Sequence, residues 1–385
     1  MNCLSRLVAY LACRWSALGR AVVTIAAVGL FAPLILASGA EYVVHISVDG
    51  LNVNIMQSLV DAGQAPNFKR FEDEGAWTIN ARTDYTHTVT LPNHTTMITG
   101  RPTLAPAGLP QVAFHNWMEN KAVQNRVTLH KDGYIPSVFD VAHDAGRSTA
   151  MFASKDKFNV FDQSYDETNG AANPHGRDKI DRYFMQNDGP PRYSQSVVDR
   201  FVEEMGVRHF NYVFLHLRDA DSVGHALQWG SSTYRQAVHG IDGYLGQIFQ
   251  LVESDAQLKG KTVIILTADH GGRPPGHDDP IYRENYTVPV FAWGAGVDHG
   301  DLYAMNEKSR KDPGDARVDY AAAGQPIRNG DTGNLALWLL GLEAIPTSSI
   351  NAAQDLRVAF PSNPKGLEAE SGANRKHAGG IQEAN

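Results

Sequence analysis

Short apolar runs rich in β-forming residues alternate with helical patterns through most of this 385-residue chain, and this alternation limits the folds it can adopt. The strand-like runs are residues 42–48, 76–82, 148–154, 211–217, 261–268 and 288–294. The longest helical pattern between them, residues 233–254, repeats apolar residues at three- and four-residue spacing. Strands joined through helices pair in parallel and are covered on both faces. The sequence therefore predicts an α/β fold, with a mostly parallel central sheet and helices on both faces.

The first 40 residues differ from the rest of the chain. They contain Arg6, Arg14 and Arg20 and no acid, followed by a long apolar run and a small-residue end before Glu41. This is the pattern of a secretory signal peptide. We therefore predict a signal peptide over residues 1–40, one domain over 41–361, a flexible tail over 362–385, and a periplasmic or secreted protein. An uncleaved anchor is the alternative, because the apolar run approaches membrane-spanning length.

Charge and cysteine content narrow the classes of partner. Cys3 and Cys13 both lie in the predicted signal, so the mature chain has no disulfide and no thiolate ligand. Loss of the three arginines changes the formal net charge from −8 to −11. We expect a chain with this negative charge to have no broad basic surface with which to bind nucleic-acid duplexes or anionic membranes. We therefore predict no stable membrane partner once the signal is cleaved. A small anionic substrate held by local cations fits this charge.

Residues 86–100 contain a candidate nucleophile, Thr90, at the expected start of a helix near 91–99. Pro92 suits the first helical turn, and a Thr just before it suits the N-cap. A helix N-terminus offers free N–H groups and a positive dipole end, which favour an anion such as phosphate. An ordinary capped helix is the alternative for so short a motif.

Carboxylates and imidazoles follow three of the predicted strands. Asp49 follows residues 42–48, Asp221 and His225 follow 211–217, and Asp269 and His270 follow 261–268, with His277 soon after. Asp221 and His225 are four residues apart, so on a helix both side chains leave one face. Each residue alone has an ordinary alternative as a turn, cap or surface residue. As a set at one sheet edge, they predict a metal site of carboxylate and imidazole, which suits zinc, with manganese or iron as competitors.

The order of motifs resembles the alkaline phosphatase superfamily, most closely its type I phosphodiesterase and nucleotide pyrophosphatase branch. The resemblance covers about residues 42–345 and rests on VDG, TLPNH, DSVGH and TADHGG, in that order. It implies two zinc ions. Asp221, His225 and His277 would hold one ion, and Asp49, Asp269, His270 and the Thr90 hydroxyl would hold the other.

The resemblance also implies substrate-binding residues, with departures from the family pattern. Asn116 is the best match to an asparagine that binds a phosphoryl oxygen, although it lies 26 residues after Thr90, a wider spacing than in the family. Lys155 and Lys157 resemble paired lysines that contact substrate in phosphonoacetate hydrolase, with a solvated surface pair as the alternative. His277 follows TADHGG more closely than in nucleotide pyrophosphatases, which indicates a different sub-branch.

These features together predict an exported two-zinc hydrolase that cleaves a small phosphodiester, of nucleotide or lipid-head-group type, through a covalent phosphothreonine at Thr90. A sulfatase is disfavoured because His94 stands where sulfatases of this superfamily have arginine. A phosphomonoesterase or phosphonate hydrolase of the same superfamily is an alternative, and a non-catalytic exported binding protein on this fold is another. The irregular stretches 101–134 and 155–193 are expected to form a cap over the substrate.

Overall fold

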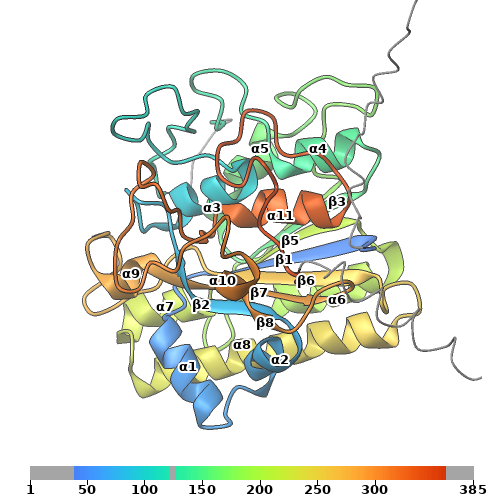
Figure 1. Ribbon diagram of the computed structural model, residues 1–385. Helices are drawn as coiled ribbons and strands as arrows, with labels where there is room; N and C mark the ends of the chain where they lie inside the picture. Colours follow the sequence, from blue (N-terminus) through green and yellow to red (C-terminus); the bar gives the residue numbers. More distant parts are fainter. Residues whose placement is uncertain (1–38, 122–126, 361–385) are drawn as a thin grey trace, which may run out of the picture. The chain divides into compact units, whose positions relative to one another are not determined.

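The computed structural model describes residues 39–121 and 127–360, whose strands form one eight-stranded sheet in the order β4-β3-β5-β1-β6-β7-β2-β8 (Figure 1). The strands are β1 (Tyr42–Val48), β2 (Ala76–Arg82), β3 (Thr149–Ala153), β4 (Arg182–Met185), β5 (Tyr212–Leu217), β6 (Thr262–Thr267), β7 (Thr287–Gly294) and β8 (Gly300–Asp301). β1 pairs in parallel with β5 on one side and β6 on the other. β7 is antiparallel to both of its neighbours, β6 and β2. The predicted mostly parallel sheet is confirmed.

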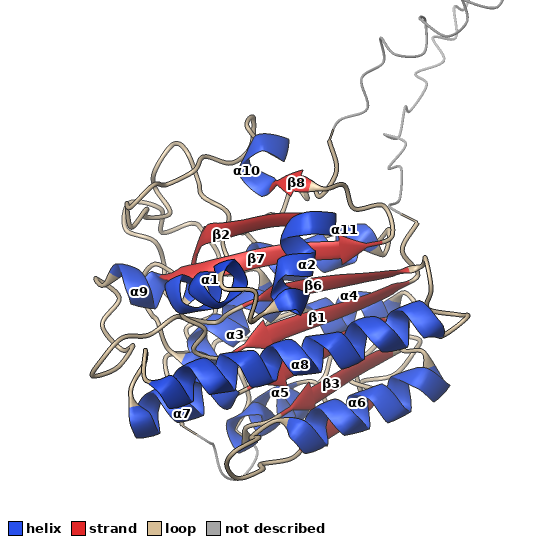
Figure 2. Cartoon of the chain, turned by 90° about the horizontal axis from the view of Figure 1, so that it is seen from below, coloured by secondary structure: helices blue, strands red, loops and turns tan. Residues whose placement is uncertain are grey.

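Helices cover both faces of this sheet, as predicted. They are α1 (Val53–Asp61), α2 (Pro66–Glu74), α3 (Thr90–Thr99), α4 (Val138–Asp144), α5 (Asn159–Ser164), α6 (Gln195–Arg208), α7 (Asp219–Leu227), α8 (Ser232–Ser254), α9 (Arg283–Tyr286), α10 (Leu302–Met305) and α11 (Asp331–Leu339), with a 3-10 turn η1 (Asp156–Phe158). Figure 1 and Figure 2 place α3, α4 and α11 on one face and α1, α2, α6 and α8 on the other.

The central strands form because their sequences are apolar on both faces. Six of seven residues of β1 and every residue of β5 and β6 are buried. α8 buries one stripe that includes Tyr234, Ile241 and Ile248, which matches its three- and four-residue spacing. A parallel strand covered on both faces needs this continuous apolar sequence, so the core lies between the sheet and its two helical layers.

Two expected features differ from the structure. The stretch 155–193 is not irregular throughout, because it contains η1, α5 and the edge strand β4, so part of the expected cap belongs to the sheet. The N-cap of α3 is Val89, and Thr90 is its first helical residue.

The predictions for the two ends of the chain lie outside the described residues. The predicted signal peptide, with Cys3 and Cys13, falls there apart from its last two positions, and so does the predicted tail over residues 362–385. Among the helices that the structure describes, none has the length and apolar character needed to cross a membrane.

Candidate metal centre

Topology brings the strand-end residues to one edge of the sheet. β5, β1 and β6 are neighbours and run parallel, so their carboxyl ends lie side by side. Asp49 directly follows β1, Asp221 lies in the first turn of α7 after β5, and Asp269 and His270 follow β6. This is the edge at which open α/β sheets bind ligands.

The six predicted ligands other than Thr90 form two groups of three, divided as the resemblance implied. In the Asp221 group (Asp221, His225 and His277), Asp221 Oδ1 lies 3.3 Å from His225 Nε2 and 3.5 Å from His277 Nε2, and the two imidazole nitrogens are 3.0 Å apart. In the Asp269 group (Asp49, Asp269 and His270), His270 Nε2 lies 3.2 Å from Asp269 Oδ2 and 3.5 Å from Asp49 Oδ1. Ligand atoms on a tetrahedral ion with bonds of about 2.0 Å are about 3.3 Å apart, so each group is spaced to grip one ion.

Four atoms of these groups are buried without a hydrogen-bond partner: Asp49 Oδ1, Asp221 Oδ1, Asp269 Oδ2 and His270 Nε2. The second oxygen of each carboxylate is satisfied within the protein. For example, Asp269 Oδ1 accepts from the backbone N–H groups of Gly50 and His270. Buried polar atoms are rarely left unpaired, and a divalent cation would satisfy all four. The donor set fits two zinc ions.

Backbone carbonyls fix which nitrogen two of the histidines present. His277 Nδ1 donates to Thr88 O at 2.6 Å, and His270 Nδ1 donates to Gly271 O at 2.8 Å. Each Nε2 is therefore left with its lone pair toward the carboxylates, the form that binds a metal. Burial also lowers the pKa of His270 to about 3, with a further contribution from His277, so this imidazole is neutral near pH 7.

Charge is unevenly balanced across the carboxylates. Burial alone would raise the pKa of Asp49, but Lys155 and a hydrogen bond from His216 outweigh it and hold this pKa well below its ordinary range. Burial and the neighbouring Asp49 carboxylate raise the pKa of Asp269 well above its ordinary value. An added cation at this position would relieve that repulsion.

Close packing near the ligands requires glycine at three positions. Gly50 has φ +69°, and a Cβ there would meet Asp221. A Cβ on Gly271 would collide with Glu284 O and one on Gly272 with the Trp229 ring. Asp269 and His270, which come just before these two glycines, both belong to the Asp269 group.

Residues on either side of Thr90 contact both groups. Two residues before it, Thr88 accepts the bond from His277 and its hydroxyl donates to His277 O. Four residues after it, His94 Nδ1 donates to Thr90 O at 2.7 Å and lies 3.6 Å from Asp269 Oδ2. Thr90 itself is buried. The segment that carries the candidate nucleophile thus contacts one ligand of each group.

An asparagine that the sequence analysis missed lies at this helix N-terminus. Asn120 Oδ1 accepts from the backbone N–H of Leu91 at 3.1 Å and from Lys157 Nζ at 3.2 Å. Asn116 instead donates to Asp132 Oδ2 at 2.8 Å, and none of its described contacts reaches the two groups. Asn116 has φ +56°, in the left-handed region that asparagine tolerates. Asn120 therefore replaces Asn116 as the candidate for this position, and Lys157 remains one.

Lys155 has a different environment from Lys157. Its side chain is buried, and Nζ lies 2.6 Å from Asp49 Oδ2 and 2.6 Å from Asp221 Oδ2. Burial alone would lower its pKa, but Asp221 and Asp49 outweigh this and raise it. The two predicted substrate-binding lysines thus separate into one inside the carboxylate cluster and one beside Asn120.

Two further histidines, for which the sequence analysis predicted no role in the site, support the ligands. His216, inside β5, donates from Nε2 to Asp49 Oδ2 at 2.9 Å, and its Nδ1 lies 3.1 Å from Ser154 Oγ. His94 Nε2 lies 2.8 Å from Ser47 Oγ. Both imidazoles are fully buried. For His216 the sequence held one signal: it stands in a predicted buried strand, where an imidazole needs polar partners.

Solvent reaches the two groups unequally. The side chains of Asp49, Asp269 and His270 are 0% exposed, whereas that of His225 is 51% exposed. The Asp221 group therefore borders solvent through His225, and the Asp269 group lies beneath it.

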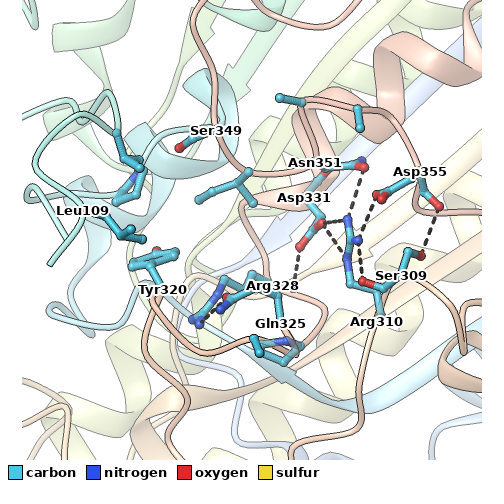
Figure 3. Close-up of a pocket in the computed structure, with 17 residues that line it drawn as sticks. Leu109, Ser309, Arg310, Tyr320, Gln325, Arg328, Asp331, Ser349, Asn351 and Asp355 are labelled. Atoms are coloured by element: carbon cyan, nitrogen blue, oxygen red, sulfur yellow. Dashed lines mark hydrogen bonds and ion pairs between the residues drawn. The ribbon is translucent and has the colours of Figure 1, made fainter. Parts of the chain in front are cut away.

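A separate cavity of about 460 Å³ lies away from these groups (Figure 3). None of the sequence-predicted site residues lines it. Three of its charged side chains point at one another: Arg310 pairs with Asp331 at 2.7 Å and with Asp355 at 2.9 Å, as the dashed lines show. The guanidinium of Arg328 donates to the backbone carbonyls of Thr83 and Val318. Since these charges are already compensated, the cavity is a weaker candidate for an anionic substrate than the metal groups.

Curated relatives share part of this chain. It is 32% identical over 143 residues to GPI ethanolamine phosphate transferase 1 of Aspergillus oryzae, a match that covers 36% of this chain and 13% of that protein. It is 25% identical over 275 residues to the protein of the same name from Homo sapiens, covering 67% of this chain and 27% of the relative. The chain thus spans about a quarter or less of the length of these relatives.

Solved structures show the same fold at low identity. Murine ectonucleotide pyrophosphatase/phosphodiesterase 5, an inactive variant in complex with AMP, superimposes with a TM-score of 0.54 and 14% identity, covering 82% of this chain and 99% of the other. A protein in the alkaline phosphatase superfamily from Vibrio parahaemolyticus gives a TM-score of 0.54 and 14% identity, covering 84% and 73%. The fold is therefore that of the alkaline phosphatase superfamily.

The family model for type I phosphodiesterase/nucleotide pyrophosphatase matches residues 43–346, which include every residue of the two metal groups. The chain belongs to the type I phosphodiesterase/nucleotide pyrophosphatase family.

Proposed function

We propose that this chain is an exported hydrolase that cleaves phosphodiesters by a two-step displacement at Thr90, with two zinc ions held by the Asp221 group and the Asp269 group. The observation that carries the proposal is the set of four unpaired buried ligand atoms beside the helix that begins at Thr90. Carboxylate and imidazole donors without thiolate suit zinc, with manganese or iron as competitors. Two bound ions would supply the positive charge that stabilises an ionised nucleophile and a leaving oxygen.

In the first step the Thr90 hydroxyl oxygen forms a bond to phosphorus while the bond from phosphorus to the leaving alcohol breaks. The hydroxyl proton passes to solvent, and the leaving oxygen takes up a proton as it departs. In the second step water attacks the phosphothreonine, which releases a phosphomonoester and restores Thr90.

The N-terminal turn of α3 supplies the contacts for the non-bridging oxygens. We assign to this role the backbone N–H of Leu91, the Asn120 side chain and the Lys157 ammonium, since Leu91 and Lys157 both donate to Asn120 Oδ1. An anion between them would gain both the helix dipole and a local cation. This fits a small anionic substrate on an acidic chain.

A transferase is the second candidate. It is favoured by the names of the curated relatives, which are ethanolamine phosphate transferases. The chemistry at Thr90 would be the same, and the two activities would differ only in whether water or an alcohol attacks the phosphothreonine. A phosphomonoesterase is the third outcome to be tested, since a threonine hydroxyl can attack either type of ester.

The test is turnover by the purified zinc-loaded protein. We expect hydrolysis of bis-p-nitrophenyl phosphate to exceed that of p-nitrophenyl phosphate and to be lost with EDTA. Adding ethanolamine at increasing concentration separates transfer, which gives a new diester, from hydrolysis. Thr90→Ala should lower turnover by about 10³-fold or more with both zinc ions retained. Unchanged turnover in Thr90→Ala would exclude the proposed nucleophile.

Export is proposed on the sequence pattern of residues 1–40 alone. N-terminal sequencing of the protein recovered from periplasm or medium should begin at Glu41. Recovery of the uncleaved chain in the membrane fraction would instead identify an anchor.

A further inference from the structure

The ammonium of Lys155 joins one carboxylate from each metal group. Lys155 lies at the end of β3, just before η1, and its Nζ is 2.6 Å from Asp49 Oδ2 in the Asp269 group and 2.6 Å from Asp221 Oδ2 in the Asp221 group. Its side chain is 10% exposed. Among the described salt bridges of the two groups, this is the lysine that spans both.

Asp49 and Asp221 each bond to Lys155 through Oδ2 and leave Oδ1 without a hydrogen-bond partner. Asp49 Oδ2 takes Lys155 and His216, whereas Asp49 Oδ1 has no hydrogen-bond partner and lies 3.5 Å from His270 Nε2. Asp221 Oδ2 takes Lys155, whereas Asp221 Oδ1 has no partner and lies 3.3 Å from His225 Nε2. Lys155 therefore uses the oxygens that the metal positions do not need.

We infer that Lys155 is a positioning residue that couples the two metal positions: it holds Asp49 and Asp221 with their Oδ1 atoms turned toward the ions, and it stays between them when the ions bind. The inference rests on the two-metal part of the proposed function. It gives Lys155 a different role from substrate contact, which remains with Lys157 beside Asn120. A lysine can donate three hydrogen bonds, so two carboxylates are within its capacity.

If Lys155 couples the two metal positions, its replacement should lower the zinc affinity of both, and this can be measured. Replacing a ligand such as His225 should weaken one ion, because His225 belongs to one group. Lys155→Met should weaken both, by about 10–100-fold each, as expected when a residue that orients metal ligands is removed. Both dissociation constants would be measured for zinc by competition with a chromophoric chelator, which needs no turnover.

A matched control is available in Lys179. Lys179 is also buried, and its Nζ donates to Asp144 Oδ1 at 2.7 Å and to Gly176 O at 2.6 Å. Neither partner belongs to the Asp221 group or the Asp269 group. Lys179→Met should lower thermal stability and leave both zinc dissociation constants unchanged. If Lys155→Met changes neither constant, or only one, the coupling role is excluded.

A second measurement uses the wild-type protein and decides the question even if Lys155→Met fails to fold. Labelling with an amine-reactive reagent, followed by mass spectrometry, reports how fast each lysine reacts. We expect Lys155 to react at least about tenfold more slowly than the exposed Lys261 in both the metal-free and the zinc-loaded protein, because the ammonium stays buried on two carboxylates. A rise of Lys155 to the rate of Lys261 on zinc loading would show that the ions displace it, and would overturn the inference.

Different results would contradict the two proposals. If the zinc-loaded wild-type protein hydrolyses no phosphoester, the proposed function is wrong, and the zinc affinities still test the role of Lys155. Normal zinc affinities in Lys155→Met with full turnover would remove the coupling role alone.

Discussion

A methyl group on Gly50 would lie 2.8 Å from both Cα and Cβ of Asp221. The loop after β1 and the first turn of α7 are therefore packed backbone against backbone, and the Asp221 carboxylate takes its place from this contact. The hydrogen bond from Asp221 N to Asp49 O, 3.0 Å long, holds the same two segments together.

We predict that Gly50→Ala weakens zinc binding at the Asp221 group by about tenfold or more, because Asp221 must move away from the new methyl group. The change also places alanine at φ +69°, at a cost of about 1–2 kcal/mol. Gly63→Ala is the matched control, since Gly63 has φ +68° and no atom within 4 Å of the added Cβ. Zinc titration with thermal unfolding would separate the two effects. Equal zinc affinity in both variants would show that the contact does not position Asp221.

A second prediction separates the two asparagines. Asn120→Ala should lower kcat/KM for a diester by about 10–100-fold, because Asn120 lies between the Leu91 N–H and Lys157 at the N-terminus of α3. Asn116→Ala should stay within about threefold of wild type, because its described side-chain partner is Asp132. Steady-state kinetics on both variants is the measurement, and the reverse order of effects would restore Asn116 as the phosphate ligand.

A third prediction concerns His216. His216→Ala should weaken zinc binding at the Asp269 group by about 10–100-fold, because it removes the bond to Asp49 Oδ2. His45→Ala serves as a control: it removes another fully buried imidazole of the sheet, one bonded to Tyr212, and should affect stability alone. Chelator competition compares them. Equal zinc affinities in the two variants would argue that His216 is a packing residue.

A fourth prediction concerns pH and lies outside the metal centre. Burial and the nearby Asp178 and Asp166 raise the pKa of Asp162 from 3.8 to about 6. The folded state then binds this proton more tightly than the unfolded state, so Asp162 lowers the free energy of unfolding as pH rises from about 4 to about 6.

Asp162→Asn should therefore be more stable than wild type at pH 7, by about 1 kcal/mol after allowance for partial exposure, and equally stable near pH 4. Denaturant unfolding at the two pH values, in EDTA so that metal binding does not contribute, measures the difference. A variant less stable than wild type at pH 7 would contradict the assignment.

Much of the fold follows from the apolar runs. Residues 42–48 and 76–82 coincide with β1 and β2. The prediction of β1 follows from its mostly apolar sequence, which a strand covered on both faces of the sheet needs. β4 was not predicted, because its four residues are all only half-buried and carry a polar residue at the sheet edge. β8 has two residues, too few for any periodic pattern.

The candidate metal ligands could be predicted from the sequence because Asp49, Asp221 and Asp269 stand within four residues of a strand end, where topology decides their place. The residues that surround them could not. The sequence predicts the same role for Lys155 and Lys157. In the structure they lie on either side of the start of the turn η1, so that Lys155 contacts the carboxylates and Lys157 contacts Asn120. His216 stands in an apolar strand, and the partner that explains it, Asp49, is 167 residues away. Long-range contacts of this kind have no local pattern.

The exposure of His225 has a consequence for how the protein would take up and lose the two proposed ions. An ion bound by Asp221, His225 and His277 can exchange with solvent across the half-exposed His225 ring, whereas one bound by Asp49, Asp269 and His270 is enclosed. Dialysis against a chelator should then remove the two ions at different rates, the outer one first. A protein prepared where zinc is scarce would carry one ion in the inner position, and its activity would depend on the supply of the outer one.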